Sequence, residues 1–298
     1  MDEESNEILY AVNAAAAEVF QKMLQAPEGR SALSYIKNRG LTDETLEKFQ
    51  VGYAPASPAL KQTFLQKGFS EEDLIASGLY GSDEQGVWFR FKDRLMFPIF
   101  DPMGRVIGFS GRVMDDREPK YKNTPETAIF KKRSNLFAFD KAVWSCKSYL
   151  ILCEGQMDVI SMHQAGFTNA VASLGTALTE AQAALIKTTA YRVVLLYDTD
   201  GPGKKATQRA ISILESAGVL TYICNTLPYK DPDEMIQAGQ KEALHERLRH
   251  PMPADEYLVR EALFDGGKPD FSTAVNVLLH DCTHDRAAKV VRTIVNNL

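Results

Sequence analysis

Residues 148–166 read SYLILCEGQMDVISMHQAG, and this stretch decides the fold class. Its first half is an apolar run that ends in Glu154 and Gly155, which is typical of a buried strand. Its second half has helical character and stops at Gly166. The strand–helix order continues to residue 248, with strands expected at 148–155, 169–176, 191–200 and 220–228 and helices at 156–166, 177–189, 201–218 and 231–248. This order predicts a mainly parallel α/β sheet of about four strands flanked by helices.

Outward from this centre, the pattern changes on both sides. Before residue 80 it predicts helices over 5–36 with a break at Pro27, then over 30–38, 42–49, 60–68 and 70–77. Residues 86–113 alternate like a small antiparallel sheet, and 114–135 read as a loop. The expected organisation is a mixed N-terminal α+β subdomain (1–147), a central α/β domain (148–250) and a C-terminal helical segment (251–298) with a break at Gly266.

Composition excludes several classes of protein. The 298 residues are 45% hydrophobic and 24% charged, which is typical of globular chains. The longest apolar runs, such as 149–153, fall far short of the ~20 residues of a membrane span. Four scattered cysteines form no CxxC pair, so neither a disulfide framework nor a zinc ribbon is expected. The acidic amino terminus predicts no signal peptide, so we expect a cytoplasmic protein without a membrane partner.

Charge is distributed unevenly along the chain, whose net charge is −5. Residues 89–147 hold 13 Lys and Arg against 7 Asp and Glu, a net charge of +6, which leaves −11 elsewhere. A basic segment in an acidic chain favours a surface that contacts phosphate, although an unevenly charged solvated surface gives the same count.

Carboxylates follow the ends of three predicted strands, and one more lies a helical turn beyond the first. The set is Glu154, Asp158, Asp198, Asp200, Asp231 and Asp233. Because ligands of such sheets bind beyond the carboxyl ends of the strands, these six side chains are expected to converge. Each Asp pair alone also fits a helix cap, but three groups at one edge favour a functional site.

Converging carboxylates repel one another and call for a cation. Oxygen ligands suit Mg²⁺ or Mn²⁺, and two such ions can clamp the attacking and leaving oxygens of a phosphoryl displacement. The Gly201-Pro202-Gly203 turn supports this prediction, since a glycine turn at a helix N-terminus lets phosphate approach the backbone.

Several motifs resemble a known domain. CEGQMD (153–158), VASLGT (171–176), YDTDGPG (197–203) and DPDE (231–234) together resemble a TOPRIM domain, which bacterial primases, topoisomerases and some nucleases share. Upstream, residues 90–113 and 119–132 resemble the segment that precedes TOPRIM in bacterial replicative DNA primases, and 41–55 also fits. The resemblance spans about 41–248.

The resemblance implies the RNA polymerase core of a DNA primase, a nucleotidyltransferase of the replication fork. Its implied partners are single-stranded DNA template, ribonucleoside triphosphates and an RNA–DNA hybrid product. By motif position, Glu154 matches the catalytic glutamate, as general base or as metal ligand. Metal-binding roles are implied for Glu154, Asp158, Asp198, Asp200, Asp231 and Asp233, and nucleotide or template contacts for Arg112, Lys120, Tyr121, Asn123 and Lys132.

Two positions depart from the family pattern. Gln156 stands where the family usually has Tyr or Phe, and Thr199 where it usually has Gly. Neither removes a carboxylate, but Thr199 adds a side chain between two Asp. The family's zinc ribbon and helicase-binding domain are not expected in this sequence, so zinc is not expected and a helicase would bind through a domain absent here.

Three alternatives remain at this point. A TOPRIM nuclease or topoisomerase fragment shares the acidic motifs, but the upstream segment disfavours it. A non-catalytic nucleic-acid-binding module requires the acids to have no chemical role. VVLLYDTDG (193–201) resembles the motif of a HAD-type phosphatase, but Pro202 follows its glycine where that family has Thr.

Overall fold

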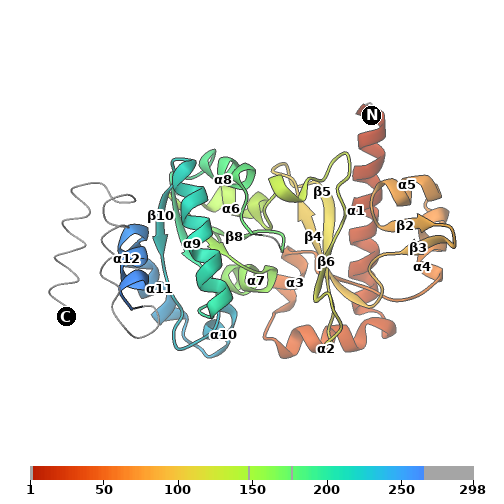
Figure 1. Ribbon diagram of the computed structural model, residues 1–298. Helices are drawn as coiled ribbons and strands as arrows, with labels where there is room; N and C mark the ends of the chain where they lie inside the picture. Colours follow the sequence, from red (N-terminus) through yellow and green to blue (C-terminus); the bar gives the residue numbers. More distant parts are fainter. Residues whose placement is uncertain (1–2, 147, 176, 265–298) are drawn as a thin grey trace.

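The computed structural model describes residues 3–146, 148–175 and 177–264. It contains two larger sheets that lie beside each other and a two-stranded hairpin, with helices packed around and between them (Figure 1). The predicted mixed α/β class with a mainly parallel sheet is confirmed. In the described part of the chain, no helix combines the length and apolar character needed to cross a bilayer.

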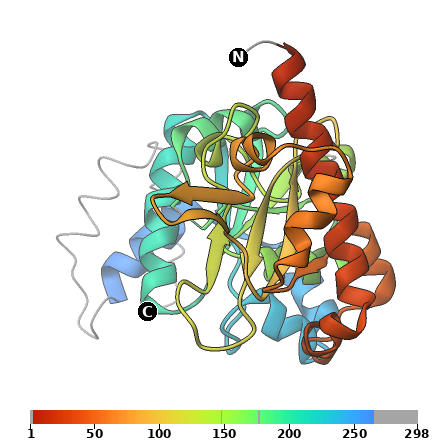
Figure 2. The same cartoon turned by 90° about the vertical axis from the view of Figure 1, so that its right-hand side faces the viewer.

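The N-terminal part is built on a four-stranded antiparallel sheet in the order β1-β4-β5-β6. A separate hairpin, β2 with β3, lies beyond helix α1 (Figures 1 and 2). The strands are β1 (Gly52–Ala54), β2 (Tyr80–Asp83), β3 (Gly86–Phe89), β4 (Arg94–Phe100), β5 (Val106–Arg112) and β6 (Tyr121–Asn123). The helices are α1 (Glu3–Gln25), η1 (Pro27–Gly29), α2 (Arg30–Asn38), α3 (Asp43–Lys48), α4 (Ala59–Gln66), α5 (Glu71–Ala76), η2 (Lys132–Ser134) and α6 (Phe139–Ser145).

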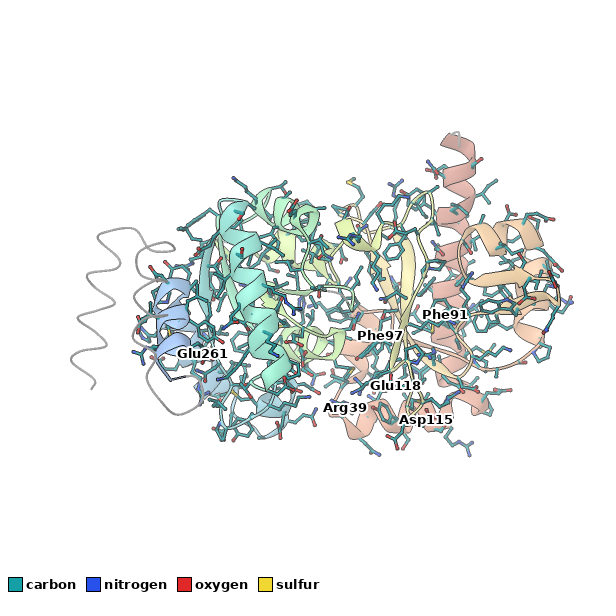
Figure 3. All side chains as sticks on the ribbon, in the orientation of Figure 1. Arg39, Phe91, Phe97, Asp115, Glu118 and Glu261 are labelled. Atoms are coloured by element: carbon teal, nitrogen blue, oxygen red, sulfur yellow. The ribbon has the colours of Figure 1, made fainter. Side chains whose placement is uncertain are left out.

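Strand β4 is apolar on both faces because the sheet is covered on both sides. Phe97 faces a core shared with the second sheet, whereas Met96 faces the core formed with α1. Phe91, just before β4, belongs to the α1 side as well, and Figure 3 labels it and Phe97 on opposite sides of the sheet. Alternation along a strand places successive side chains on opposite faces, so a continuous apolar run identifies a strand buried on both.

The second part is a five-stranded sheet in the order β11-β10-β9-β7-β8. Three of its four strand pairings are parallel, and the fourth joins the short antiparallel β11 to β10 at the edge. The elements are β7 (Tyr149–Cys153), α7 (Gln156–Gln164), β8 (Ala170–Ala172), α8 (Glu180–Lys187), β9 (Arg192–Leu196), α9 (Gly201–Ser216), β10 (Leu220–Ile223), α10 (Pro232–Gln237), α11 (Lys241–Arg249), β11 (Met252–Pro253) and α12 (Ala254–Phe264).

Helices cover both faces of this sheet. Ile151 and Val194 lie in the core with α7, α10 and α11, while Leu150 and Val193 pack on the side of α8, α9 and α12. The two parts of the molecule are also joined through the backbone, because Phe137 forms an isolated bridge with Ala172 of β8. Edge strand β8 is thus partly covered by the N-terminal part.

Several element predictions need correction. Strand β3 does not join β4 but pairs with β2, which the sequence analysis did not predict. The expected loop over 114–135 contains β6 and η2, and the single helix expected over 231–248 is two helices. Gly239 separates them with φ 74°, a left-handed conformation that ends α10. The C-terminal helical prediction holds for α12, and its continuation with the break at Gly266 lies outside the described residues.

Candidate active site

The candidate site lies where the connections of the parallel sheet reverse direction. From β7 the chain passes to β8 on one side and then returns to β9 on the other side of β7. Helices therefore diverge between the carboxyl ends of β7 and β9, which is where open α/β sheets bind their ligands. Glu154 follows β7 directly, and Asp198 and Asp200 follow β9.

A cavity of about 340 Å³ opens at this point. Carboxylates from the parallel sheet and basic groups from the N-terminal part share its wall. Its polar lining includes Glu154, Asp158, Asp198, Asp231 and Asp233 together with Arg39, Arg112, Lys120, Tyr121 and Lys230. The structure therefore brings five of the six expected carboxylates to one cavity, and Asp200 adjoins it through Lys230.

One carboxylate oxygen of Glu154 has no hydrogen-bond partner in this cavity. Burial, followed by the charge of Asp198, raises its pKa to about 7, although a backbone hydrogen bond from Asp198 opposes the shift. Its Oε1 atom is buried and has no hydrogen-bond partner. A buried carboxylate oxygen without a partner is costly, so this atom is suited to bind a proton or a cation.

Asp158 is a buried carboxylate of the cavity. Its Oδ2 accepts a hydrogen bond of 3.0 Å from the backbone N–H of Gly155, which closes the first turn of α7. Burial, then the charges of Asp231 and Asp198, raise its pKa well above the ordinary range. Without a cation, burial and the neighbouring carboxylates therefore favour the protonated form of Asp158.

Asp198 and Asp200 are bridged by a lysine that the sequence analysis did not single out. Lys230 Nζ lies 3.3 Å from Asp198 Oδ2 and 3.7 Å from Asp200 Oδ2. Burial raises the pKa of Asp198, and the hydrogen bond from Lys230 opposes that rise. Asp200 also caps α9, since its Oδ1 accepts from the Gly203 N–H at 2.9 Å. The sequence signal for Lys230 was its place directly before the Asp231–Asp233 pair.

The second Asp pair has other partners. Asp231 caps α10 by accepting from the Glu234 N–H at 2.8 Å. Asp233 is 2% exposed, pairs with the Arg39 guanidinium and accepts from the Ser161 hydroxyl. Arg39 comes from the N-terminal part, and Figure 3 shows it where the two parts meet. Asp233 thus holds the two parts together at the cavity wall.

The basic wall is held by tyrosines. Arg112 is 6% exposed, and its guanidinium donates to the hydroxyls of Tyr121 at 2.7 Å and Tyr35 at 3.0 Å. Burial, opposed by Arg112, raises the pKa of Tyr121 to about 12. These contacts fix the orientation of the Arg112 guanidinium. Lys120 is exposed and has no described carboxylate within 4 Å of its ammonium group.

Two expected contact residues lie outside the cavity lining. Asn123 donates to the carbonyl of Leu174 at 2.7 Å and so ties β6 to the segment after β8. Lys132 begins η2, where its carbonyl accepts from Gln182 at 3.3 Å. Gln156, the departure from the family pattern, is buried and donates to Ser110 at 3.3 Å, which joins α7 to β5.

The donor set of the cavity fits a hard divalent cation. Glu154 and Asp198 supply carboxylate oxygens from its lining, Asp200 adjoins it through Lys230, and Glu154 Oε1 lacks any partner. Within the described residues, no three His, Cys, Asp or Glu side chains already form a ready metal-binding group. Lys230 and the helix caps account for this, because they hold Asp198, Asp200 and Asp231 in other contacts.

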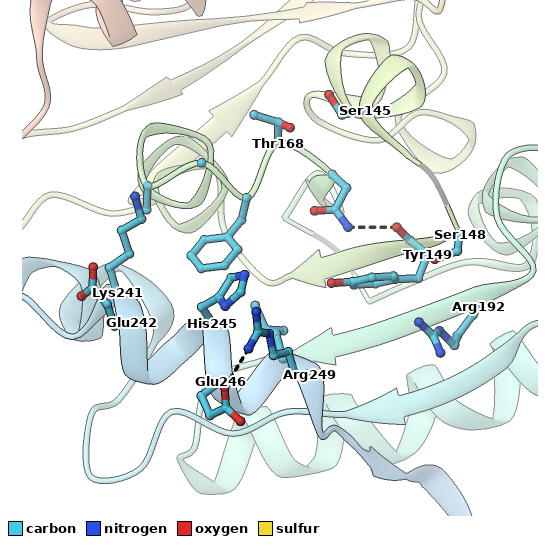
Figure 4. A pocket seen from close by; sticks show the side chains of 15 residues that line it. Ser145, Ser148, Tyr149, Thr168, Arg192, Lys241, Glu242, His245, Glu246 and Arg249 are labelled. Carbon is cyan, nitrogen blue, oxygen red and sulfur yellow. Dashed lines mark hydrogen bonds and ion pairs between the residues drawn. The ribbon is translucent and has the colours of Figure 1, made fainter.

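A larger cavity, of about 900 Å³, lies at the opposite edge of the parallel sheet (Figure 4). It is lined by the beginnings of β7 and β9 and by α11, with Arg192, Lys241, His245 and Arg249 among its residues. Glu246 pairs with Arg249 at 3.4 Å within it. Because it lacks the strand-end carboxylates, the smaller cavity is the better candidate for metal-dependent chemistry.

Two family models match the chain. One is described as the N-terminal domain of the DNA primase catalytic core and matches residues 19–143, and the other as Toprim-like and matches residues 151–236. The DNA primase of Clostridium acetobutylicum is 41% identical over 263 residues, which cover 88% of this chain and 44% of that protein. The DNA primase of Deinococcus radiodurans is 43% identical over 260 residues, covering 85% and 45%. The chain thus spans a little under half the length of these relatives.

Solved structures are similar over almost the whole chain. The RNA polymerase domain of Mycobacterium tuberculosis primase DnaG has a TM-score of 0.87 at 28% identity, with 97% of this chain and 98% of that chain covered. The zinc-binding and RNA polymerase domains of the Aquifex aeolicus primase give 0.80 at 32% identity, covering 94% and 73%. A DnaG primase catalytic domain bound to single-stranded DNA gives 0.77 at 29% identity, covering 93% and 95%.

Proposed function

Since this chain belongs to the family of bacterial DNA primases, we propose that it is a catalytic core that synthesises short RNA primers. The substrates are ribonucleoside triphosphates, the template is single-stranded DNA, and the product is an RNA–DNA hybrid. The reaction is nucleotidyl transfer, in which the primer's 3′-hydroxyl attacks an α-phosphate and pyrophosphate leaves.

One observation carries this proposal. Strand-end carboxylates and the oriented Arg112 guanidinium line the same cavity, although they come from different parts of the molecule. Nucleotidyl transfer requires both, since the carboxylates hold cations and the basic groups bind phosphate. The similarity to a primase catalytic domain bound to single-stranded DNA supports the choice of template.

We assign the metal-binding role first to Glu154, Asp198 and Asp200, with Asp158 and Asp231 beside them. We propose that the site binds two or more divalent cations, either Mg²⁺ or Mn²⁺. When bound, these ions would activate the hydroxyl and neutralise phosphate charge. Asp233 remains in the set as a positioning residue, because Arg39 and Ser161 use its oxygens.

The protein's own groups perform the remaining tasks. Glu154 takes one of two roles, metal ligand or acceptor of the proton from the attacking hydroxyl, because its buried Oε1 has no other partner. Arg112 binds phosphate oxygens in a fixed direction, and Lys120 adds a mobile positive charge at the cavity mouth. Asn123, Tyr121 and Lys132 support these contacts from β6 and η2.

The proposed domain limits are 1–147, 148–250 and 251–298. The four-stranded sheet ends before the first limit and the parallel sheet begins after it, which supports that division. Strand β11 lies beyond the second limit yet pairs with β10, so this sheet extends to Pro253. A cytoplasmic location at the replication fork and a helicase partner through another domain are also part of the proposal.

The test is primer synthesis by this chain from labelled ribonucleotides on single-stranded templates, with MgCl₂, MnCl₂ or EDTA. We expect short RNA products in either metal and none in EDTA. Cleavage of the template without RNA synthesis would contradict the proposal and favour the nuclease alternative. Template binding without either reaction would favour a non-catalytic binding module.

A further inference from the structure

Lys230 shares the carboxylates that the proposed function assigns to metal. Its ammonium group lies within 4 Å of both Asp198 and Asp200, and its side chain is 57% exposed. Among the described residues, no other cation comes within that distance of either carboxylate. Arg39 is paired with Asp233, and Arg112 is held by tyrosines, so neither takes this position.

The backbone of Lys230 is fastened to the segment that carries the two Asp residues. Its carbonyl accepts from the Thr199 N–H at 2.9 Å and from the Thr199 hydroxyl at 3.3 Å. Its own N–H donates to Glu234 Oε2 at 2.6 Å. Thr199 lies between Asp198 and Asp200, so the loop and the carboxylates move as one unit and the ammonium group stays within reach of both.

Thr199 therefore has a function that the sequence alone did not reveal. Its hydroxyl also contacts the carbonyl of Tyr229 at 3.3 Å. One side chain therefore holds Tyr229 and Lys230, two consecutive residues of the loop before α10, which we call the lysine loop. The primase family that this sequence resembles usually has glycine at this position. Glycine has no hydroxyl, so only the hydrogen bond from the backbone N–H of residue 199 to the Lys230 carbonyl would remain. Thr199 thus holds the lysine loop in place, and Lys230 supplies the positive charge beside the two carboxylates.

The position of Lys230 affects the electrostatic repulsion among the carboxylates. Ionised carboxylates that meet at a sheet edge repel one another, and a nearby cation relieves that repulsion. A divalent cation at Asp198 and Asp200 would compete with Lys230 for these carboxylates, since the Oδ2 atom of each faces Lys230 and Asp200 Oδ1 already caps α9. An ammonium group and a metal ion cannot both contact these atoms at short range, because their charges repel.

We propose that Lys230 is a built-in counter-ion which pairs with Asp198 and Asp200 in the metal-free protein and is displaced when a divalent cation binds. Lys230 thereby raises the concentration of free divalent cation that the site requires. This inference rests on the proposed metal-binding role of the two Asp residues. The displaced ammonium group moves to solvent, which its exposure permits.

The experiment measures Mn²⁺ binding by the full chain, from the electron paramagnetic resonance signal of free Mn²⁺ at fixed ionic strength. Lys230→Gln should bind Mn²⁺ about 3–10-fold more tightly, as expected for losing one competing, partly exposed ion-pair cluster. Thr199→Val, which keeps the shape but removes the hydroxyl, should shift the affinity in the same direction by less. Lys230→Arg keeps the charge and should stay near the wild-type affinity.

Lys204→Gln is the matched control. Lys204 lies on the first turn of α9 beside Asp200 but pairs with Glu261 at 3.0 Å, so its loss removes an equal charge without freeing either Asp. We expect its affinity to stay within about twofold of wild type. A second readout is the melting temperature in EDTA, which should fall for Lys230→Gln because the carboxylates lose their counter-ion.

The results separate this inference from the function on which it rests. Unchanged or weaker Mn²⁺ binding by Lys230→Gln, or equal tightening by Lys204→Gln, overturns the counter-ion role. If Asp198→Asn loses Mn²⁺ binding at the same time, the metal site stands and only the role of Lys230 falls. If Asp198→Asn binds Mn²⁺ like wild type, the assigned site is wrong and the inference falls with it.

Discussion

At the scale of single residues, Glu154 makes stability depend on pH. Because burial and Asp198 raise its pKa to about 7, the folded protein holds a proton that the unfolded chain releases near pH 4.3. Its contribution to the free energy of unfolding is full below the unfolded-state pKa and is lost as pH rises through 7. Glu154→Gln should therefore raise the melting temperature in EDTA at pH 8 but hardly at pH 5. An equal difference from wild type at both pH values would contradict this cause.

Asp198 is the residue whose loss should separate activity from stability. Asp198→Asn removes a proposed metal ligand, so we expect primer synthesis to fall at least about 100-fold. Burial already disfavours the charged form of Asp198, so the melting temperature in EDTA should not decrease. Asp43→Asn, at a side chain that is 84% exposed, is the control and should leave synthesis unchanged. Near-normal synthesis by Asp198→Asn would remove it from the site.

Removing one partner of the Arg39–Asp233 ion pair should lower the free energy of unfolding. Asp233 is buried, so Arg39→Met leaves a carboxylate without its counter-charge and should cost about 2–4 kcal/mol in urea unfolding. Combining Arg39→Met with Asp233→Asn should cost less than the sum of the two changes. Simple additivity would show that the pair is not coupled.

At the scale of elements, the first turn of α9 positions both Asp198 and Asp200. A Cβ added at Gly203 would lie 2.2 Å from the backbone oxygen of Asp198, whereas one at Gly201 meets nothing within 4 Å. Gly203→Ala should therefore cost about 1–3 kcal/mol in unfolding free energy and reduce primer synthesis. Gly201→Ala, two residues away, should stay within about 0.5 kcal/mol of wild type. Equal effects of the two changes would exclude the close approach as the cause.

The elements that the sequence predicted well carry local signals. Thr42, Ser70 and Thr179 cap α3, α5 and α8 with their side chains; the first two stand at predicted helix starts and Thr179 lies two residues after one. The long parallel strands were predicted from their apolar runs. The short strands β1, β6 and β11 were not predicted, because their pairing depends on distant partners rather than on their own sequence.

The candidate site was predictable in its carboxylates but not in its counter-charges. Strand ends in an alternating sequence must meet at one edge, so the convergence of Glu154, Asp198 and Asp231 followed from topology. The ion pairs of Arg39 and Lys230 depend on how the N-terminal part and the lysine loop pack. The hydrophobic periodicity of the sequence gives no information on that packing. The burial of Tyr121 under Arg112 is of the same kind.

At the scale of the whole molecule, the basic side of the cavity should control how salt affects DNA binding. Each lost phosphate contact should lower the slope of log K against log salt by about 0.7 for single strands. Lys120→Gln should therefore reduce the slope measured by fluorescence anisotropy. Lys241→Gln, which removes the same charge in the cavity at the opposite edge of the sheet, should not. The same slope in both variants would place the DNA path elsewhere.

The apolar core that joins the two sheets limits how this protein can be divided. Phe49 of the N-terminal part lies 6.0 Å from Phe137 and 5.1 Å from His163, ring centre to ring centre, and the same core reaches Met162 in α7. A fragment that begins at Ser148 lacks Phe49 and Phe137, so it would expose His163 and Met162 to water and should aggregate when expressed alone. For the same reason, a chimera assembled from the N-terminal half of one relative and the C-terminal half of another inherits a mismatched interior. Exchange between such proteins is therefore favoured as one uninterrupted unit.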